Sequence, residues 1–188
     1  METQDILLQR RSVYPRQFSG QSIPKEALLR AFEAANWAPT HKRTQPWRFI
    51  IYSGVAMQRL VDQWVKMAQR NAEAKGEPWA EANVAKFDLM RKSSHILVIA
   101  CHYTGLVPEI EETCATAASV QNFWLSLQDQ GYHGYWSTGN GIFGEEMHSW
   151  FKLAENEKAL GYFLAGVAEG AIPPSVRKPV GDHLRWEE

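Results

Sequence analysis

Three arginines and a serine lie within a short stretch near the start of the chain, QRRSVYPRQF. Arg10, Arg11, Ser12 and Arg16 offer guanidinium groups and a hydroxyl, which are donors that suit a phosphate group. The alternative is a solvated basic end of a helix, and the local sequence alone favours it because arginine pairs are common on surfaces. A phosphate site here therefore depends on support from other parts of the chain.

A second set of donors lies in the stretch NWAPTHKRTQPWRF, where residues 40–45 read Thr-His-Lys-Arg-Thr-Gln. Loops between regular elements carry function more often than cores do. A plain polar connection between a helix and a strand, closed by Pro46, explains the same residues and is the simpler interpretation in isolation.

Two more stretches add weaker signals. YWSTG, residues 135–139, places aromatic rings, two hydroxyls and a glycine at the end of an expected strand. RKP brings positive charge back at Arg177 and Lys178, in a part of the chain where tails are often disordered. Neither stretch defines a site alone.

The stretch TGNGIFG matches G-x-G-x-x-G at Gly139, Gly141 and Gly144, which is the spacing of a dinucleotide-binding turn. The preceding residues GYHGYWST are too polar and too rich in glycine for a Rossmann first strand, and too little chain follows Glu169 to build more sheet. The glycines favour a loop that lets the backbone approach a flat group.

Composition excludes several other classes of protein. The net charge of -1 gives no overall attraction for nucleic acid or an anionic membrane. The six histidines show no H-E-x-x-H and the two cysteines no C-x-x-C, so no metal site is expected. Serine-hydrolase and P-loop motifs are missing too.

The expected location is the cytoplasm. The start METQDILLQRRS has no apolar segment of a signal peptide, and no run approaches the length of a membrane span. Cys101 and Cys114 lie in apolar segments, which is typical of free thiols in a reducing compartment.

The elements that would position these residues form one α+β domain over residues 1–188. Apolar spacing predicts helices and strands in mixed order. The expected helices span 1–11, 22–37, 55–70, 77–92, 113–131 and 147–151, and the expected strands 46–54, 96–101, 131–136 and 159–168. The all-apolar run 96–101 predicts a central strand.

The helix expected at 113–131 is apolar on nearly every side from Cys114 to Leu127. Such a helix is buried in a large core or against another subunit. Because the chain is short, the second explanation is favoured, and we expect a homodimer with this helix at its interface.

In this order, RRS…R.F, APTHKRTQPWRF, SSHILVIA, PEIEE…A.SVQNFWL, YWSTG and RKP resemble the flavin-dependent nitroreductase family over essentially the whole chain. The resemblance implies a nitroreductase-like α+β fold with a central mixed, mostly antiparallel sheet flanked by helices. It also implies an intertwined homodimer with FMN at the interface. One departure is that the usual RRSxRxF is stretched to RRSVYPRQF, which leaves the role of Arg16 open.

By the same resemblance, Arg10, Arg11 and Ser12 hold the FMN phosphate and ribityl chain. Arg177 and Lys178 assist them, and His41 reaches across from the partner subunit. Trp136, Ser137, Thr138 and Gly139 line the flavin. No catalytic side chain is implied, because the flavin carries the chemistry.

The implied function is reduction of nitroaromatic or quinone-like small molecules by NADH or NADPH, with a ping-pong mechanism. His41, Arg16 and Lys42 are candidates for tuning the flavin electrostatically. Two alternatives stay open: an FMN dimer that stores or senses flavin without turnover, and a flavin enzyme with oxygen or another acceptor. Residues 66–87 form either a lid over the flavin or a solvated helical excursion.

Overall fold

The structure is a computed structural model that describes residues 2–79, 81–139, 141–172 and 174–187. It contains α1 (Thr3–Gln9), α2 (Lys25–Asn36), β1 (Trp47–Ser53), α3 (Gly54–Ala74), α4 (Glu81–Met90), β2 (His95–His102), α5 (Glu109–Asp129), β3 (His133–Ser137), α6 (Glu145–Trp150) and β4 (Glu157–Gly166). Short 3-10 turns lie at Pro15–Gln17, His41–Arg43 and Val180–His183. The expected alternation of helices and strands is therefore present.

The four strands form one sheet in the order β1-β2-β4-β3, and every neighbouring pair is antiparallel. A mixed, mostly antiparallel sheet was expected. Its parallel part is an isolated bridge between Ser12 and Gly134. β2 is buried from Ile96 to Cys101, which confirms the central strand. A strand that is covered on both faces can be apolar throughout and does not have to alternate polar and apolar residues.

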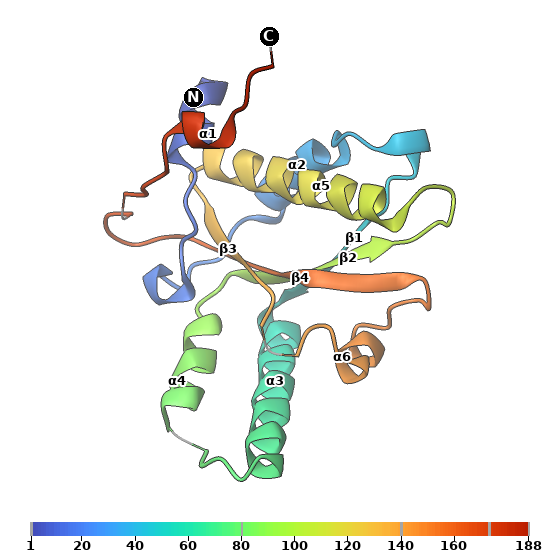
Figure 1. Cartoon of the computed structure of the whole chain (residues 1–188). Helices are drawn as coiled ribbons and strands as arrows, with labels where there is room; N and C mark the ends of the chain where they lie inside the picture. Colours follow the sequence, from blue (N-terminus) through green and yellow to red (C-terminus); the bar gives the residue numbers. More distant parts are fainter. Residues whose placement is uncertain (1, 80, 140, 173, 188) are drawn as a thin grey trace.

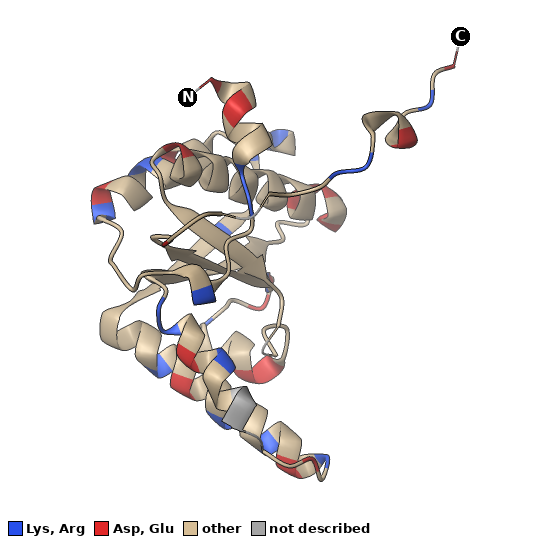
Figure 2. Cartoon of the chain, turned by 90° about the vertical axis from the view of Figure 1, so that its left-hand side faces the viewer, with Lys and Arg blue, Asp and Glu red and all other residues tan. Residues whose placement is uncertain are grey.

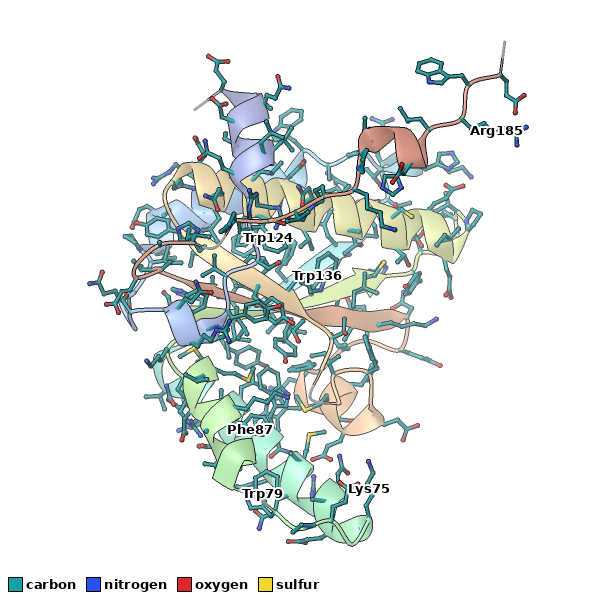
Figure 3. All side chains as sticks on the ribbon, turned by 60° about the vertical axis from the view of Figure 1, so that its left-hand side comes forward. Lys75, Trp79, Phe87, Trp124, Trp136 and Arg185 are labelled. Atoms are coloured by element: carbon teal, nitrogen blue, oxygen red, sulfur yellow. The ribbon has the colours of Figure 1, made fainter. Side chains whose placement is uncertain are left out.

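Helices cover the two faces of the sheet as separate layers, α2 and α5 on one face and α3, α4 and α6 on the other (Figure 1). Successive strand residues point to opposite faces, so Leu97 and Ile99 pack with α2 and α5 while Ile96 and Val98 pack with α3. Figure 3 shows the same division, with Trp124 and Phe87 on opposite sides of the sheet.

α5 begins at Glu109 with three acids in its first turn, which suits the positive end of the helix dipole. Its buried side, with Val120, Phe123 and Leu127, packs on the sheet and α2. The opposite stripe leaves Cys114 and Gln121 exposed and Ala117 and Leu125 partly exposed. Within one chain, the sheet and α2 therefore cover one side of α5 and leave the opposite stripe uncovered.

The start of α2 differs from the sequence prediction. The expected helix begins at residue 22, but α2 begins at Lys25, with Pro24 at the N-cap position without a side-chain bond. The preceding Ile23 N–H donates to Ser94 Oγ at 2.6 Å. This tertiary hydrogen bond ties the residues before α2 to the segment that enters β2.

The antiparallel order confirms that TGNGIFG is no Rossmann turn. Among the described residues between β3 and β4, which leave out Asn140 of the motif, α6 is the one helix, and β4 runs antiparallel to β3, whereas a dinucleotide fold needs parallel strands joined by a crossover helix. The tail from residue 174 leaves the body of the molecule along an extended path (Figure 2). The described part of the chain has no helix with the length and apolarity to cross a bilayer.

Candidate functional site

The stretched arginine motif is anchored at both ends by backbone hydrogen bonds. The Val13 N–H donates to the Gly134 carbonyl on β3 at 3.0 Å, and the Ser19 N–H donates to the Val167 carbonyl after β4 at 2.9 Å. Because paired backbone groups fix a segment, residues 14–17 form an arch over the end of the sheet. The arch is a defined structural feature rather than a free helix end.

Buried and exposed residues alternate along the arch. Val13, Pro15 and Phe18 are buried in the core, and Phe18 bridges to Ala168. Tyr14 and Arg16 lie between them and are exposed. The apolar residues therefore hold the arch down while Tyr14 and Arg16 face outward beside Ser12.

The arch and the C-terminal tail enclose a cavity of about 380 Å³, which we call the arginine cradle. Its lining residues are Arg10, Arg11, Ser12, Tyr14, Arg16, Gln17, Pro174, Ser175 and Arg177. Segments more than 150 positions apart thus meet, as the sequence had suggested for Arg10, Arg11, Ser12 and Arg177. Lys178 is exposed and does not line the cradle.

The cradle carries positive charge that no described carboxylate compensates. Burial lowers the pKa of Arg10, and the nearby positive charges of Arg177 and Arg11 lower it further. The Arg10 guanidinium lies over the Trp124 ring, 4.3 Å from its centroid, and Arg11 donates to the Leu8 carbonyl at 2.6 Å. Among the described residues these arginines form no ion pair, so an anion with several acceptor oxygens suits the cradle.

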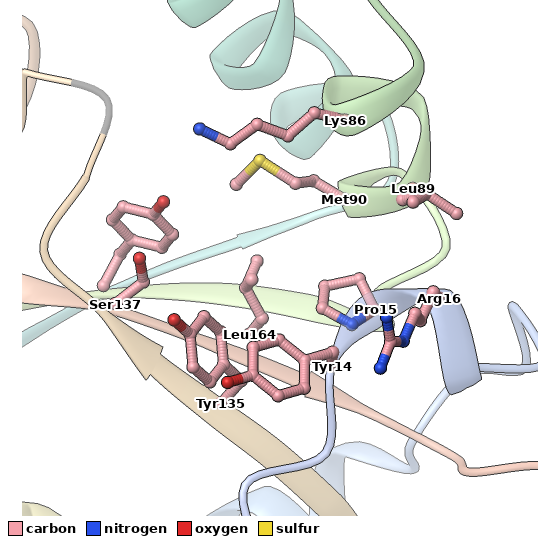
Figure 4. A pocket seen from close by; sticks show the side chains of 10 residues that line it. Tyr14, Pro15, Arg16, Lys86, Leu89, Met90, Tyr135, Ser137 and Leu164 are labelled. Atoms are coloured by element: carbon pink, nitrogen blue, oxygen red, sulfur yellow. The ribbon is translucent and has the colours of Figure 1, made fainter. Parts of the chain in front are cut away.

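A second cavity of about 550 Å³ lies beside the cradle (Figure 4), and we call it the tyrosine pocket. It is lined by Tyr14, Pro15, Arg16, Lys86, Leu89, Met90, Tyr135, Ser137, Tyr162 and Leu164. Tyr14 and Arg16 line both cavities. The two spaces are therefore adjacent and share one wall, the arch.

The walls of the tyrosine pocket suit a flat ligand. The rings of Tyr14 and Tyr135 lie 4.4 Å apart at an interplanar angle of 36°, and the Arg16 guanidinium lies 5.7 Å from the Tyr14 ring centroid. Leu89, Met90 and Leu164 add apolar surface. Ligand sites commonly combine such apolar walls with a few polar groups, here the hydroxyls of tyrosine and serine side chains.

The residues at the end of β3 divide between the two faces of the sheet. Ser137 lines the tyrosine pocket, but Trp136 packs with the α2 and α5 layer, and its Nε1 has no hydrogen-bond partner. Thr138 and Gly139 are exposed where the strand ends, and the Gly139 N–H donates to Ser137 Oγ at 3.4 Å. Within one chain, only Ser137 of these four residues lines the pocket.

The His41 loop lies at the other end of α5, away from both cavities. His41 Nδ1 is 2.5 Å from Glu111 Oε2, whereas Arg10 lies against Trp124. Glu111 and Trp124 are thirteen residues apart (124 − 111), which is about 20 Å along a helix. One chain therefore does not bring His41 to the cradle.

The backbone of this loop is unusual. Lys42, Arg43 and Gln45 all have positive φ, between 44° and 56°, although none of them is glycine. Such conformations cost free energy and concentrate at functional sites. Lys42 Nζ also donates to the Leu106 carbonyl at 3.0 Å, which ties the loop to its own chain, and none of residues 40–45 lines the cradle or the tyrosine pocket.

Sequence reasoning missed several residues that line the tyrosine pocket. Tyr135 has a usable signal, because it lies two positions before Ser137 and strand residues at i and i+2 share a face. By the same rule Trp136, which lies between Tyr135 and Ser137, faces the other side of the sheet. Lys86, Leu89 and Met90 follow helical spacing, but the sequence alone gives no reason for α4 to turn that side toward β3.

The fold and the two cavities define an α+β protein with a basic cavity next to a larger pocket whose walls are mostly aromatic and aliphatic. Residues 7–167 match a family model described as the nitroreductase family, and the chain therefore belongs to the nitroreductase family. The family resemblance of the sequence motifs is confirmed, and so is the expected enzyme class, the oxidoreductases.

Two relatives extend over nearly the whole chain. YfhC of Bacillus subtilis, whose name marks it as a proposed NAD(P)H nitroreductase, is 26% identical over 181 residues, covering 96% of this chain and 91% of YfhC. YdjA of Escherichia coli K12, named in the same way, is 24% identical over 180 residues, covering 95% of each chain.

Solved structures confirm the nitroreductase-like fold. A nitroreductase-like family protein from Bacillus cereus matches with a TM-score of 0.82 at 23% identity, covering 100% of this chain and 97% of the other. The FMN-dependent nitroreductase NfnB from Mycobacterium smegmatis, solved with NADPH, matches with a TM-score of 0.76 at 17% identity, covering 98% and 97%. At these identities the likeness establishes the architecture alone.

Proposed function

We propose that the protein is an FMN-dependent oxidoreductase that uses NADH or NADPH to reduce small flat acceptors, nitroaromatics or quinones, by a ping-pong mechanism. The observation that carries the proposal is the uncompensated arginine cradle directly beside the tyrosine pocket. Family membership supports it, as do the names of relatives as NAD(P)H nitroreductases and of one structural neighbour as FMN-dependent.

The donors of the cradle fit the phosphate of FMN. Arg10, Arg11, Ser12 and Arg177 present charged or hydroxyl donors without a described carboxylate to compete, and a phosphate monoester brings the matching negative charge. Lys178 would contribute charge only after a movement of the exposed tail. The adjacent pocket offers the aromatic and aliphatic walls that a ring system needs.

When bound, the flavin supplies the redox chemistry by accepting a hydride from the nicotinamide and passing two electrons to the acceptor. The protein's own side chains would bind the flavin and orient it. The arginines fix the phosphate end, while Tyr14, Tyr135 and Leu164 keep water from the ring. The Ser137 hydroxyl offers a polar contact at the end of β3. A side-chain nucleophile is not required.

We infer that the working form is a homodimer in which each site takes the His41 loop of the second copy. The distance of about 20 Å between His41 and the cradle along α5 leaves His41 without a role inside one chain. In a twofold dimer the same surfaces meet reciprocally, so one pairing of α5 helices would complete two sites. The exposed Val176, Val180 and Trp186 of the tail are apolar surface that a second copy would cover.

Light scattering tests the dimer directly. We expect twice the chain mass at micromolar concentration, and a monomeric mass would remove the inference. The expected cytoplasmic location remains a prediction that cell fractionation would check.

The first functional experiment is the visible absorbance of the purified protein, followed by anaerobic addition of NADPH and of NADH. Flavin bands that bleach and return with a nitroaromatic or quinone support the proposed oxidoreductase. Bands that persist favour the alternative of a storage or sensing dimer. A colourless protein that refuses added FMN would contradict both.

Steady-state kinetics then test the shared pocket. Both substrates meet the same site in turn, which predicts parallel double-reciprocal lines. Intersecting lines would contradict a ping-pong mechanism. Product analysis distinguishes nitro or quinone reduction from a reaction in which oxygen is the acceptor.

A further inference from the structure

We propose that Glu112 is a positioning residue, which fixes the His41 loop, residues 40–45, in the shape that the flavin site of the second copy receives. The inference rests on the proposed function, and in particular on the homodimer in which this loop acts across the interface. A chain of hydrogen bonds carries it, from the buried Glu112 carboxylate through Thr104 and Leu106 to Lys42. Of the described residues that line the arginine cradle and the tyrosine pocket, none belongs to this chain of hydrogen bonds.

Glu112 is buried although its side chain is a carboxylate. The residue is 1% exposed, on the same buried side of α5 as Thr116 and Ser119. Acidic residues are seldom fully buried unless they have partners, because burying a carboxylate without them is strongly unfavourable. The hydrogen bonds of Glu112 therefore decide what this residue does.

Thr104 donates two kinds of hydrogen bond to this carboxylate. Its hydroxyl donates to Glu112 Oε1 at 2.7 Å, and its backbone N–H lies 3.1 Å from Oε2 and 3.3 Å from Oε1. Hydrogen bonds to a charged acceptor are about twice as strong as those between neutral groups. They fix Thr104, which comes two positions after the end of β2, against α5.

The turn after Thr104 extends this attachment to the surface. The Leu106 N–H donates to Thr104 Oγ1 at 3.2 Å, and Gly105 between them has a φ of 72°, which glycine adopts without strain. The Leu106 carbonyl then accepts the hydrogen bond from Lys42 Nζ at 3.0 Å. A buried group of α5 is thus connected to the middle of the His41 loop.

The His41 loop needs support from outside because its backbone is strained. Lys42, Arg43 and Gln45 have positive φ, and non-glycine residues keep such conformations only where the surrounding structure holds them. The turn after β2 lies beside the loop at the same end of α5 (Figure 1). The contact between Lys42 and the Leu106 carbonyl therefore holds the loop where its strain is concentrated.

Glu111 and Glu112 hold the same loop in two different ways. Successive helix residues point about 100° apart, so Glu111 faces the surface and contacts His41 directly, whereas Glu112 faces the interior. An exposed pair such as His41 and Glu111 contributes little. The buried bonds of Glu112 are therefore the firmer of the two attachments, although Glu112 itself does not touch the loop.

Hydrogen exchange of the full-length protein tests this attachment without any ligand. The Thr44 N–H donates to the His41 carbonyl, so its exchange rate reports on the loop. In Glu112→Gln we expect this amide to exchange at least about tenfold faster, because the local structure opens more often. The control is Glu109→Gln, which removes an equal charge from the same helix turn but from a side chain that bonds Lys158. Unchanged Thr44 exchange in Glu112→Gln would overturn the inference.

FMN affinity tests whether the loop is held for the flavin site. Glu112→Gln should weaken FMN binding about threefold, because it displaces one contact of ordinary hydrogen-bond strength, and Glu109→Gln should leave the affinity unchanged. In a chain that already carries His41→Ala, Glu112→Gln should cause no further loss, because the contact that it positions is gone. An equal loss in both backgrounds would show that Glu112 supports the fold in general, which overturns the inference.

Two variants of Thr104 test the same attachment at a partly exposed position, which keeps the test open if Glu112→Gln does not fold. Thr104→Val removes the hydroxyl that joins Glu112 to Leu106 and should reproduce both effects. Thr104→Ser keeps the hydroxyl and should restore the exchange rate and the affinity. If serine restores neither, the hydroxyl is not the connecting group and the inference is wrong. Thermal melting of each variant shows whether the fold is retained.

The outcomes separate this inference from the proposed function. If the unmodified protein binds and reduces FMN but Glu112→Gln and Thr104→Val bind it equally well, the positioning role is wrong and the oxidoreductase stands. If the unmodified protein binds no FMN, the proposed function fails, and a role of Glu112 in a flavin site fails with it. The exchange rates then show separately whether Glu112 holds the loop.

Discussion

The two ends of α5 differ in how complete their chemistry is within one chain. At the C-terminal end, Trp124 supports Arg10, and two segments of the same chain, residues 10–17 and 174–177, line the arginine cradle. At the N-terminal end, Glu111 holds His41 on a loop with strained backbone, and His41 lines neither the cradle nor the tyrosine pocket. We infer that the first end is the binding site for the phosphate and that the second is a part supplied to another copy.

The largest expected effect on FMN affinity comes from a substitution in the arginine cradle. Arg10→Gln removes a partly buried guanidinium of the uncompensated group, and a charge-assisted hydrogen bond contributes roughly 1.5–3 kcal/mol. We expect FMN affinity to fall about 100-fold, which corresponds to about 2.8 kcal/mol, as measured by titration of FMN fluorescence. Arg30→Gln is the control, since Arg30 is exposed on α2 and bonds Gln130. A loss under threefold in the Arg10 variant would show that the phosphate binds elsewhere.

The second-largest expected effect comes from disrupting the inferred dimer. Ala117 lies on the open stripe of α5 between Cys114 and Gln121, so Ala117→Arg places a charge where the second copy is inferred to pack. We expect the mass in solution to halve and FMN affinity to fall at least about tenfold, or about 1.4 kcal/mol, because each cradle loses the other chain's loop. Gln69→Arg on the exposed side of α3 should change neither value. A monomer that binds FMN normally would place the whole site in one chain.

His41→Ala should weaken FMN binding about fivefold, since a single exposed contact is lost. The sharper test mixes subunits, one carrying Arg10→Gln and the other His41→Ala. If His41 acts across the interface, one site of the mixed dimer has both changes and the other has neither, so half of the sites bind FMN with unmodified affinity. If His41 acts within its own chain, every site carries one change and no site of full affinity appears in the titration.

Most of the fold was predictable because it follows from local patterns. The buried run Ile96–Cys101 and the helical spacing of α2 and α3 are visible in the sequence. Ends of elements were harder, as at α2, which begins at Lys25 rather than at residue 22, after Ile23 has bonded the distant Ser94. Hydrogen bonds between distant segments have no local signature, so sequence spacing does not reveal them.

The arginine cradle and the tyrosine pocket also differ in how far they could be predicted before the structure was known. The grouping of Arg10, Arg11, Ser12 and Arg177 was expected only from the family resemblance, because the local sequence alone favoured a solvated helix end. The tyrosine pocket was not, since Tyr14, Lys86 and Tyr162 meet only when the arch, α4 and β4 pack together. The resemblance implied that Trp136 and Ser137 both line the flavin, whereas within one chain they lie on opposite sides of the sheet, as successive strand residues do.

The smallest effect that we expect is a pH dependence at the cradle end of α5. Burial lowers the pKa of His133 and of His95, so the unfolded chain binds these protons more readily than the folded protein does. Their contribution to stability is complete above the ordinary histidine pKa of about 6.5 and is lost as pH falls from there toward the lowered values. Melting temperature should therefore be lower at pH 5.5 than at pH 7.5.

His133 precedes Gly134, which accepts the hydrogen bond from Val13, so acid should loosen the arch before it affects the His41 end. His133→Gln removes the titrating group and should reduce the pH slope of the melting temperature, with the remainder left to His95. His183→Gln, on the exposed tail, should leave the slope unchanged. Hydrogen exchange of the Val13 amide that does not accelerate at pH 5.5 would show that the two ends of α5 respond to acid alike.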